Sequence, residues 1–100
     1  MRQDDITRDA QLLVLISLAS GPKHGHAILL DAADFTGHRM GPGTLYGAIE
    51  RLEKAGLIAA EAAEERRVPY RLTEDGRAAL RRRLASLELI ARVGLVRAAR

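Results

Sequence analysis

The sequence predicts a winged helix-turn-helix, a mainly α fold with a small β-hairpin followed by a long C-terminal helix. Two observations predict it within a single 100-residue chain. Apolar residues recur at helical spacing in four segments and alternate in two short ones, which flank a charged stretch. Glycine and proline also stand where each of the first three helices is expected to begin or end.

The first helix is expected over a run of apolar side chains wide enough to bury most of its circumference. These residues are Leu12, Leu13, Leu15, Ile16 and Leu18. Asp4, Asp5 or Thr7 would cap its start, because short polar side chains accept hydrogen bonds from the free N–H groups of a first turn. The segment 20–22, Ser-Gly-Pro, would end it.

The second and third helices form the predicted helix-turn-helix pair. The second is expected from about His24-Gly25 to Phe35, with Ile28, Leu29, Ala32 and Phe35 on one face, and Thr36-Gly37 ends it. The third opens at Gly41-Pro42-Gly43-Thr44, because proline suits the first helical turn. Its inward residues are Leu45, Ile49 and Leu52, and Gly56 follows its end.

Two short strands are expected over 57–61 and 68–72, with the polar stretch 62–67 forming the tip of a wing. Tyr70 and Leu72 alternate with Arg71, so we expect the first two to pack on the core. Thr73-Glu74-Asp75 then caps a helix from about residue 74 to near residue 100.

Composition narrows the classes of function. Without cysteine, the chain has no disulfide, thiolate metal site or thiol nucleophile. We find no catalytic constellation and no cofactor fingerprint, and His24 and His26, two residues apart, diverge on a helix, so no enzyme, cofactor or metal site is predicted. No apolar run spans a bilayer and no secretory signal is apparent, which predicts a cytoplasmic protein without membrane contact.

The charge pattern favours a polyanionic partner. The net charge is +3, and residues 41–100 carry twelve Lys/Arg against eight Asp/Glu. At about 100° per residue, the outward face of the third helix holds small, polar and cationic groups, with Thr44 and Tyr46 on its flanks. Its members are Gly43, Gly47, Glu50, Arg51 and Lys54. Such a helix can enter the major groove of DNA.

Other segments offer further DNA contacts. Arg66 and Arg67 at the wing tip would reach phosphates or the minor groove, although a solubilising charged turn is the alternative. His24 and Gly25 would clamp the backbone at the start of the second helix, or His24 is a helix cap. The predicted DNA-binding residues are His24, Gly25, Pro42, Gly43, Thr44, Tyr46, Gly47, Arg51, Lys54, Arg66 and Arg67.

The terminal helix predicts self-association. Its apolar stripe of Leu80, Leu84, Leu87 and Ala91 is widened by Leu89, Ile90, Val93 and Val96, which is more than one small core can cover. We therefore expect a homodimer interface containing Leu84, Leu87, Ile90 and Val93. The chain would divide into a DNA-binding domain, 1–76, and a dimerisation helix, 77–100.

Several of these motifs, in this order, resemble a PadR-type transcriptional regulator over roughly residues 12–80. They are Gly21-Pro22-Lys23-His24-Gly25 after the first helix, Gly41 to Tyr46, Arg51-Leu52-Glu53, Gly56-Leu57-Ile58, and Tyr70 to Arg77. The chain departs from the pattern at His26, where an aromatic residue is common, and at Gly47, where proline is common.

The resemblance implies a DNA-binding repressor that dimerises through its C-terminal helix and often has an effector pocket near the dimer interface. The predicted function is therefore a sequence-specific regulator that reads the major groove with residues 42–55 and the adjacent backbone or minor groove with the wing at 57–72. A winged-helix module that binds protein, or a small-molecule sensor without strong DNA binding, is the alternative.

Overall fold

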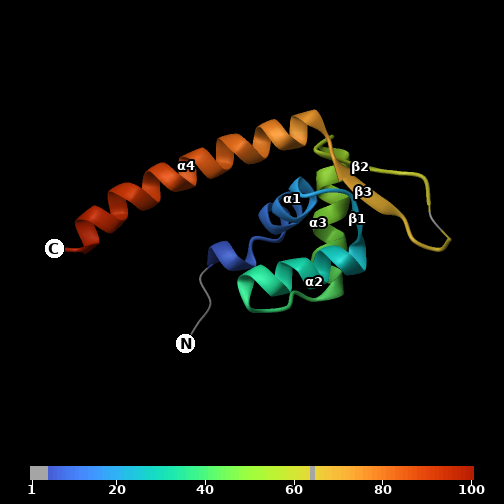
Figure 1. Cartoon of the computed structure of the whole chain (residues 1–100), viewed down its shortest axis with the longest axis horizontal. Helices are drawn as coiled ribbons and strands as arrows, with labels where there is room; N and C mark the ends of the chain where they lie inside the picture. Colours follow the sequence, from blue (N-terminus) through green and yellow to red (C-terminus); the bar gives the residue numbers. More distant parts are fainter. Residues whose placement is uncertain (1–4, 64) are drawn as a thin grey trace.

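A computed structural model describes residues 5–63 and 65–100, and it has the predicted architecture (Figure 1). The elements are η1 (Asp5–Arg8), α1 (Ala10–Ala19), β1 (Lys23–His24), α2 (Gly25–Thr36), α3 (Pro42–Lys54), β2 (Ile58–Ala60), β3 (Pro69–Leu72) and α4 (Glu74–Ala98). Three helices and a small sheet form a compact body, from which α4 projects, so the molecule measures 55 × 31 × 20 Å.

The start of α1 differs from the prediction. Residues Asp5–Arg8 form the short 3-10 helix η1, whose Ile6 carbonyl accepts from the Asp9 N–H at 3.4 Å. Asp9 is consequently the residue that precedes α1, and its carboxylate accepts from the Leu12 N–H at 3.1 Å. The cap expected at Asp5 or Thr7 was therefore wrong, and Asp4 lies outside the described residues.

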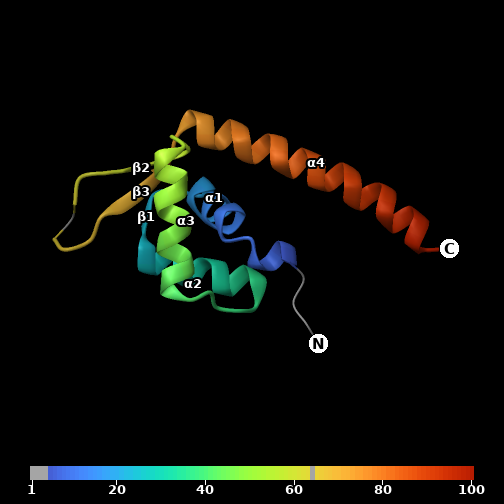
Figure 2. The ribbon, with the colours of Figure 1, turned by 180° about the vertical axis from the view of Figure 1, so that it is seen from behind.

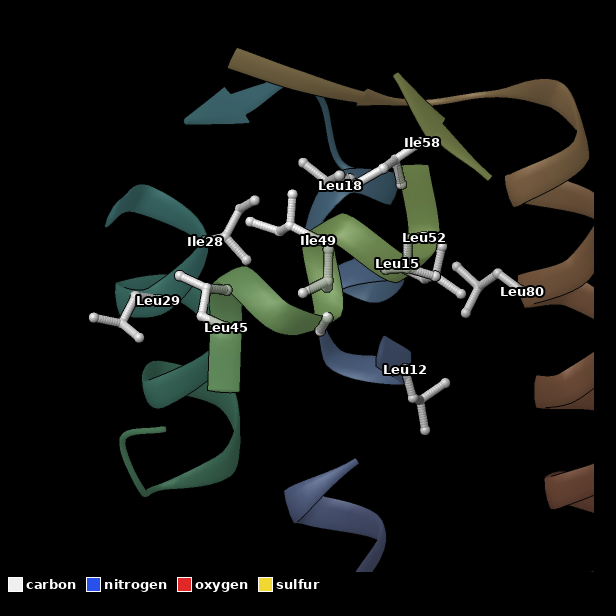
Figure 3. Close-up of a cluster of buried hydrophobic side chains, with 12 residues drawn as sticks. Leu12, Leu15, Leu18, Ile28, Leu29, Leu45, Ile49, Leu52, Ile58 and Leu80 are labelled. Carbon is white, nitrogen blue, oxygen red and sulfur yellow. The ribbon is translucent and has the colours of Figure 1, made fainter. Parts of the chain in front are cut away.

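The core is centred on α1, which packs against α2, α3 and α4 (Figure 3). Leu12, Leu15 and Leu18 of α1 are buried, as are the predicted inward residues of α3, which are Leu45, Ile49 and Leu52. Ile28 and Leu29 of α2 and Ile58 of β2 complete this cluster. The periodic apolar pattern of the sequence thus identified the buried faces of α1 and α3.

Phe35 was expected on the buried face of α2 and is instead 45% exposed. The residue lies in the last turn of α2, which extends beyond α3 (Figure 1). Its phase around the helix is that of Ile28 and Ala32, which are buried, so helical spacing alone did not decide its exposure. Gly37 then ends α2 with a φ of 81°, a left-handed conformation that glycine adopts at little cost.

The sheet has three antiparallel strands in the order β1-β3-β2, one more than the predicted hairpin. Lys23 pairs with Tyr70 and His24 with Pro69, so the segment before α2 forms the edge of the wing. β2 and β3 fall inside the two predicted strands, and Tyr70 and Leu72 pack against the core as expected.

Helix α4 is anchored to the body over its first half, where Arg83 also pairs with Asp9. Gly76 and Leu80 are buried there, and a Cβ at position 76 would lie 2.9 Å from the Leu57 carbonyl carbon and closer still to its oxygen. Leu87 still packs partly on the core, whereas the rest of the helix runs away from it (Figure 2). The proposed division at residue 76 falls inside this continuous helix.

Candidate nucleic-acid interface

The outward face of α3 is open to solvent, as predicted. Gly43, Thr44, Glu50, Arg51 and Lys54 are exposed and Gly47 is partly exposed. Gly41 precedes the helix and Pro42 occupies its first turn, with no side chain capping the free N–H groups. Positive partial charge therefore faces solvent at this end. At the other end, Lys54 and Glu50 form an exposed ion pair of 3.5 Å, and Arg51 is exposed on the same face.

Tyr46 extends from α3 toward the first turn of α2. Its ring approaches the backbone of Gly25 so closely that a Cβ on Gly25 would lie 2.7 Å from the ring carbon Cζ. Gly25 itself is buried, whereas Tyr46 remains 50% exposed. The structure thus places Gly25 beneath a tyrosine and Tyr46 at the surface between the two helices.

His24 is the N-cap of α2. The sequence had left open whether this residue is a helix cap or a contact to the DNA backbone. Its Nδ1 accepts from the Ala27 N–H at 3.4 Å, while its Nε2 lies 3.1 Å from a guanidinium nitrogen of Arg67. Arginine only donates, and a neutral imidazole has one acceptor nitrogen. His24 can therefore satisfy either Ala27 or Arg67 at a given moment, which leaves Arg67 available to another acceptor.

The wing places two arginines beside α3. Arg66 and Arg67 are exposed, and Glu65 before them has a φ of 57° at the turn. Farther along β3, Arg71 pairs with Glu61 at 3.9 Å. Burial raises the pKa of the Tyr70 phenol, and the negative charge of Glu53 and the neighbouring Tyr46 raise it further. Tyr70 is consequently a neutral hydrogen-bonding group at physiological pH.

A cleft of about 330 Å³ brings together five of the predicted DNA-binding residues. It is lined by His24, Gly25, His26, Tyr46, Arg66, Arg67, Val68 and Tyr70. Wing, α2 and α3 each contribute to it. Four other predicted residues of α3 do not line this cleft. Arg51 and Lys54 lie in the C-terminal half of α3, and Pro42 and Gly43 lie at the N-terminal end of the helix.

A second cleft, of about 340 Å³, lies at the N-terminal end of α3. Thr44 lines it together with Arg8, Leu13, His38, Arg39, Met40 and Gly41. Arg8 and Arg39 were absent from the predicted site. Arg39 had a detectable signal, since it lies three residues before Pro42, but the contribution of Arg8 depends on how η1 folds back toward α3.

Across residues 5–63 and 65–100, no cluster of three His, Cys, Asp or Glu side chains suits a metal ion. None of the helices described is both long and apolar enough to cross a membrane.

The paired helices α2 and α3 with an antiparallel wing beside them define a winged helix-turn-helix protein. The model of the Transcriptional regulator PadR-like family matches residues 13–82. The chain belongs to this family of transcriptional regulators.

Two relatives match most of this chain in sequence. The chain is 41% identical over 86 residues to a transcriptional regulator of Mycobacterium tuberculosis, covering 82% of this chain and 78% of that protein. It is 47% identical over 81 residues to an uncharacterized 37.1 kDa protein in a transposon of Streptomyces fradiae, covering 81% of this chain. The match spans only 24% of the length of the transposon protein.

Solved structures show the same fold. A transcriptional regulator from Clostridium thermocellum superimposes with a TM-score of 0.82 at 30% identity, covering 93% of this chain and 94% of that one. A PadR family regulator from Eggerthella lenta gives 0.76 at 31% identity, over 92% and 85% of the two chains. BpsR of Bordetella bronchiseptica, whose DNA binding is regulated by 6-hydroxynicotinic acid, gives 0.70 at 28% identity, over 85% and 62%.

Proposed function

We propose that this chain is a sequence-specific double-stranded DNA-binding regulator that acts as a repressor. The proposal depends on one observation: α3 and the wing contribute to the same exposed surface. Tyr46 of α3 and Arg66 and Arg67 of the wing line one cleft, and Arg51 and Lys54 extend the exposed face of the same helix. A helix fits the major groove of B-DNA, which is about 12 Å wide, while basic side chains beside it reach the backbone.

The two ends of α3 would have different roles. Its uncapped N-terminus, with Pro42, Gly43 and the Thr44 hydroxyl, suits a phosphate, because free N–H groups and the helix dipole favour an anion. Arg51, in the last turns, has the length and donors to reach base edges. The phosphate contacts would fix the register of the helix, and the arginine would read sequence.

A protein-binding winged helix is the competing function. Such a module would present an acidic or apolar face at α3. The exposed face of α3 carries Arg51 and Lys54 beside Glu50. The adjacent cleft is lined by Arg66 and Arg67 and by no acidic side chain of the described residues, and this chemistry favours a phosphate backbone.

We further propose that the regulator is a homodimer joined through α4 and responsive to a small molecule. Ile90, Val93 and Val96 are 67%, 44% and 67% exposed on a helix that projects from the body, and a second copy would cover them. 6-hydroxynicotinic acid regulates the DNA binding of the structural neighbour BpsR, and this supports a small-molecule effector for the present chain. A pocket between two copies of α4 would hold it.

Binding to a short duplex, followed by fluorescence anisotropy as salt is raised, tests the DNA-binding proposal. Arg51→Ala and an Arg66→Ala/Arg67→Ala double variant should weaken binding. Each lost phosphate contact should reduce the slope of log K against log salt by about 0.9. The expected result is a steep slope for the unmodified protein and a shallower one for the wing variant.

Arg92→Ala is the matched control. Arg92 is an exposed arginine paired with Glu88 at 3.2 Å, and it belongs to the C-terminal half of α4, which extends away from the wing (Figure 1). Its removal lowers the net charge by one without touching α3. If Arg92→Ala weakens binding as much as Arg51→Ala, binding follows overall charge and the proposed surface is wrong.

A further inference from the structure

The backbone conformation at position 25 does not require glycine, because Gly25 has no positive φ. It is the first residue of α2, and the described glycines with positive φ are Gly21, Gly37 and Gly56. Alanine at a helical position is favoured over glycine by about 0.5–1 kcal/mol. The residue must therefore be explained by its surroundings and not by its own conformation.

The three heavy atoms nearest to a Cβ at position 25 all belong to the side chain of Tyr46. A Cβ on Gly25 would lie 2.7 Å from Cζ and 2.8 Å from Cε1 of Tyr46, and nearer still to the Tyr46 hydroxyl. Real Cβ atoms essentially never approach other atoms this closely, so a side chain at position 25 would displace the end of the Tyr46 side chain from its present place. Elsewhere in the described chain, only Gly76 has any neighbour within 4 Å of such a Cβ, and that neighbour is mainly backbone.

The contact joins the two helices of the helix-turn-helix pair at the cleft beside the wing. The hydroxyl end of the Tyr46 side chain lies next to Gly25, and the residue as a whole is 50% exposed. The same cleft contains Arg67, Val68 and Tyr70. The missing side chain at position 25 thus determines where the phenolic hydroxyl of α3 points.

We propose that Gly25 is a positioning residue for DNA binding: it does not bind DNA itself but leaves the space that holds the Tyr46 hydroxyl at the edge of the wing cleft, where it donates to a phosphate. This inference rests on the proposed function and deepens it, because Tyr46 becomes a contact fixed in advance. Preorganised donors lose less conformational entropy on binding than mobile ones.

A double-mutant cycle on a short duplex tests the proposal. Tyr46→Phe removes the hydroxyl and keeps the ring, and should weaken binding about tenfold, the value of one hydrogen bond to a charged group. Gly25→Ala should weaken it by a similar factor by displacing the ring. The double variant Gly25→Ala/Tyr46→Phe should bind no more weakly than Tyr46→Phe alone, because the contact can be lost only once.

Gly94→Ala is the control at a helical glycine with open space around it in one copy. Because α4 is the proposed dimer helix, the sedimentation of this variant is measured as well, and a Gly94→Ala protein that sediments like the unmodified one should keep its duplex affinity. If Gly25→Ala fails to fold, Gly25→Ala/Tyr46→Ala should restore folding by removing the ring. Unchanged affinity for Gly25→Ala, or additive losses in the cycle, would overturn the proposal.

Nuclear Overhauser contacts in the free protein separate this inference from the DNA-binding proposal. Cross-peaks between the Gly25 Hα protons and the Tyr46 ring are expected in the unmodified protein, and their absence would contradict the packing. If they are present but Arg51→Ala and the wing variant bind DNA normally, the proposed surface fails while the packing stands. That result would also refute a positioning role of Gly25 in DNA binding.

Discussion

Ser17 is a polar side chain within the apolar core. It is 1% exposed, and its hydroxyl makes no hydrogen bond within the described part of the chain. Its carbonyl, in contrast, accepts from the Lys23 ammonium at 2.5 Å and from the Ser20 hydroxyl at 3.0 Å. A buried hydroxyl without a partner costs about 1–3 kcal/mol of stability.

We therefore predict that Ser17→Ala raises the free energy of unfolding by about 1 kcal/mol. A urea titration should show a higher midpoint with an unchanged slope. Ser20→Ala is the matched control: Ser20 is exposed and its hydroxyl also accepts from Lys23 at 2.7 Å, so its removal should give no gain. A lower midpoint for Ser17→Ala would mean that the hydroxyl has a partner, such as a bound water.

Helical phase predicted the buried face of α3 correctly, although it placed Phe35 of α2 in the core, where it does not lie. Leu45, Ile49 and Leu52 share one face of α3 and are buried, because the partner of an amphipathic helix is almost always the core. The role of Gly25 was not accessible in this way. Its importance arises from a side chain 21 positions later, and only the packing of α2 against α3 brings the two together.

At the scale of secondary-structure elements, Thr73 connects three elements through hydrogen bonds. Its hydroxyl donates to the Gly56 carbonyl at 2.7 Å and accepts from the Gly76 N–H at 3.0 Å, while its own N–H donates to the Leu57 carbonyl at 3.1 Å. The end of α3, the start of β2 and the cap of α4 thus meet at one threonine. This junction sets the direction in which α4 leaves the body.

Thr73→Ala should lower the free energy of unfolding by about 1–2 kcal/mol, the usual loss for an N-cap. Thr73→Ser keeps the hydroxyl and should retain most of the stability. Thermal denaturation of the three proteins at one concentration is the measurement. Equal losses for both variants would show that the methyl group, and not the hydroxyl, is what the junction needs.

The elements were predictable as far as their signals are local. Gly37 and Gly56 each follow a helix, in positive φ, as their positions in the sequence indicated. Strand β1 was missed because two residues carry no alternation, and it exists only by pairing with β3. The cap of α1 was misplaced because η1 takes up residues that the sequence equally allowed as a cap.

In the whole molecule, the two proposed surfaces lie apart. The wing and α3 occupy one end, and the free half of α4 extends toward the other (Figures 1 and 2). One copy therefore has its basic cleft clear of the helix that a second copy would cover. Two copies related by a two-fold axis would present two α3 helices to successive half-sites about 34–36 Å apart.

The dimer can be tested separately from folding because its residues differ in burial. Leu80 is 5% exposed and belongs to the core, and Leu87 packs at its margin, whereas Leu84 and Ile90 are 40% and 67% exposed. Ile90→Asp should therefore leave the fold of one copy intact, since surface substitutions away from special features usually change stability by about 0.5 kcal/mol or less. In a two-fold interface the same substitution would bury two unpaired charges.

Sedimentation at micromolar concentration is the direct measurement. The unmodified protein should behave as a dimer and Ile90→Asp as a folded monomer with a normal helical spectrum. Ile90→Ala should weaken association by about 2–5 kcal/mol for each site that becomes a cavity. Leu80→Ala, in contrast, should lower the melting temperature by opening a cavity in the core of each copy. If Ile90→Asp remains a dimer, the subunits meet elsewhere, and the apolar half of α4 must be covered by a different partner.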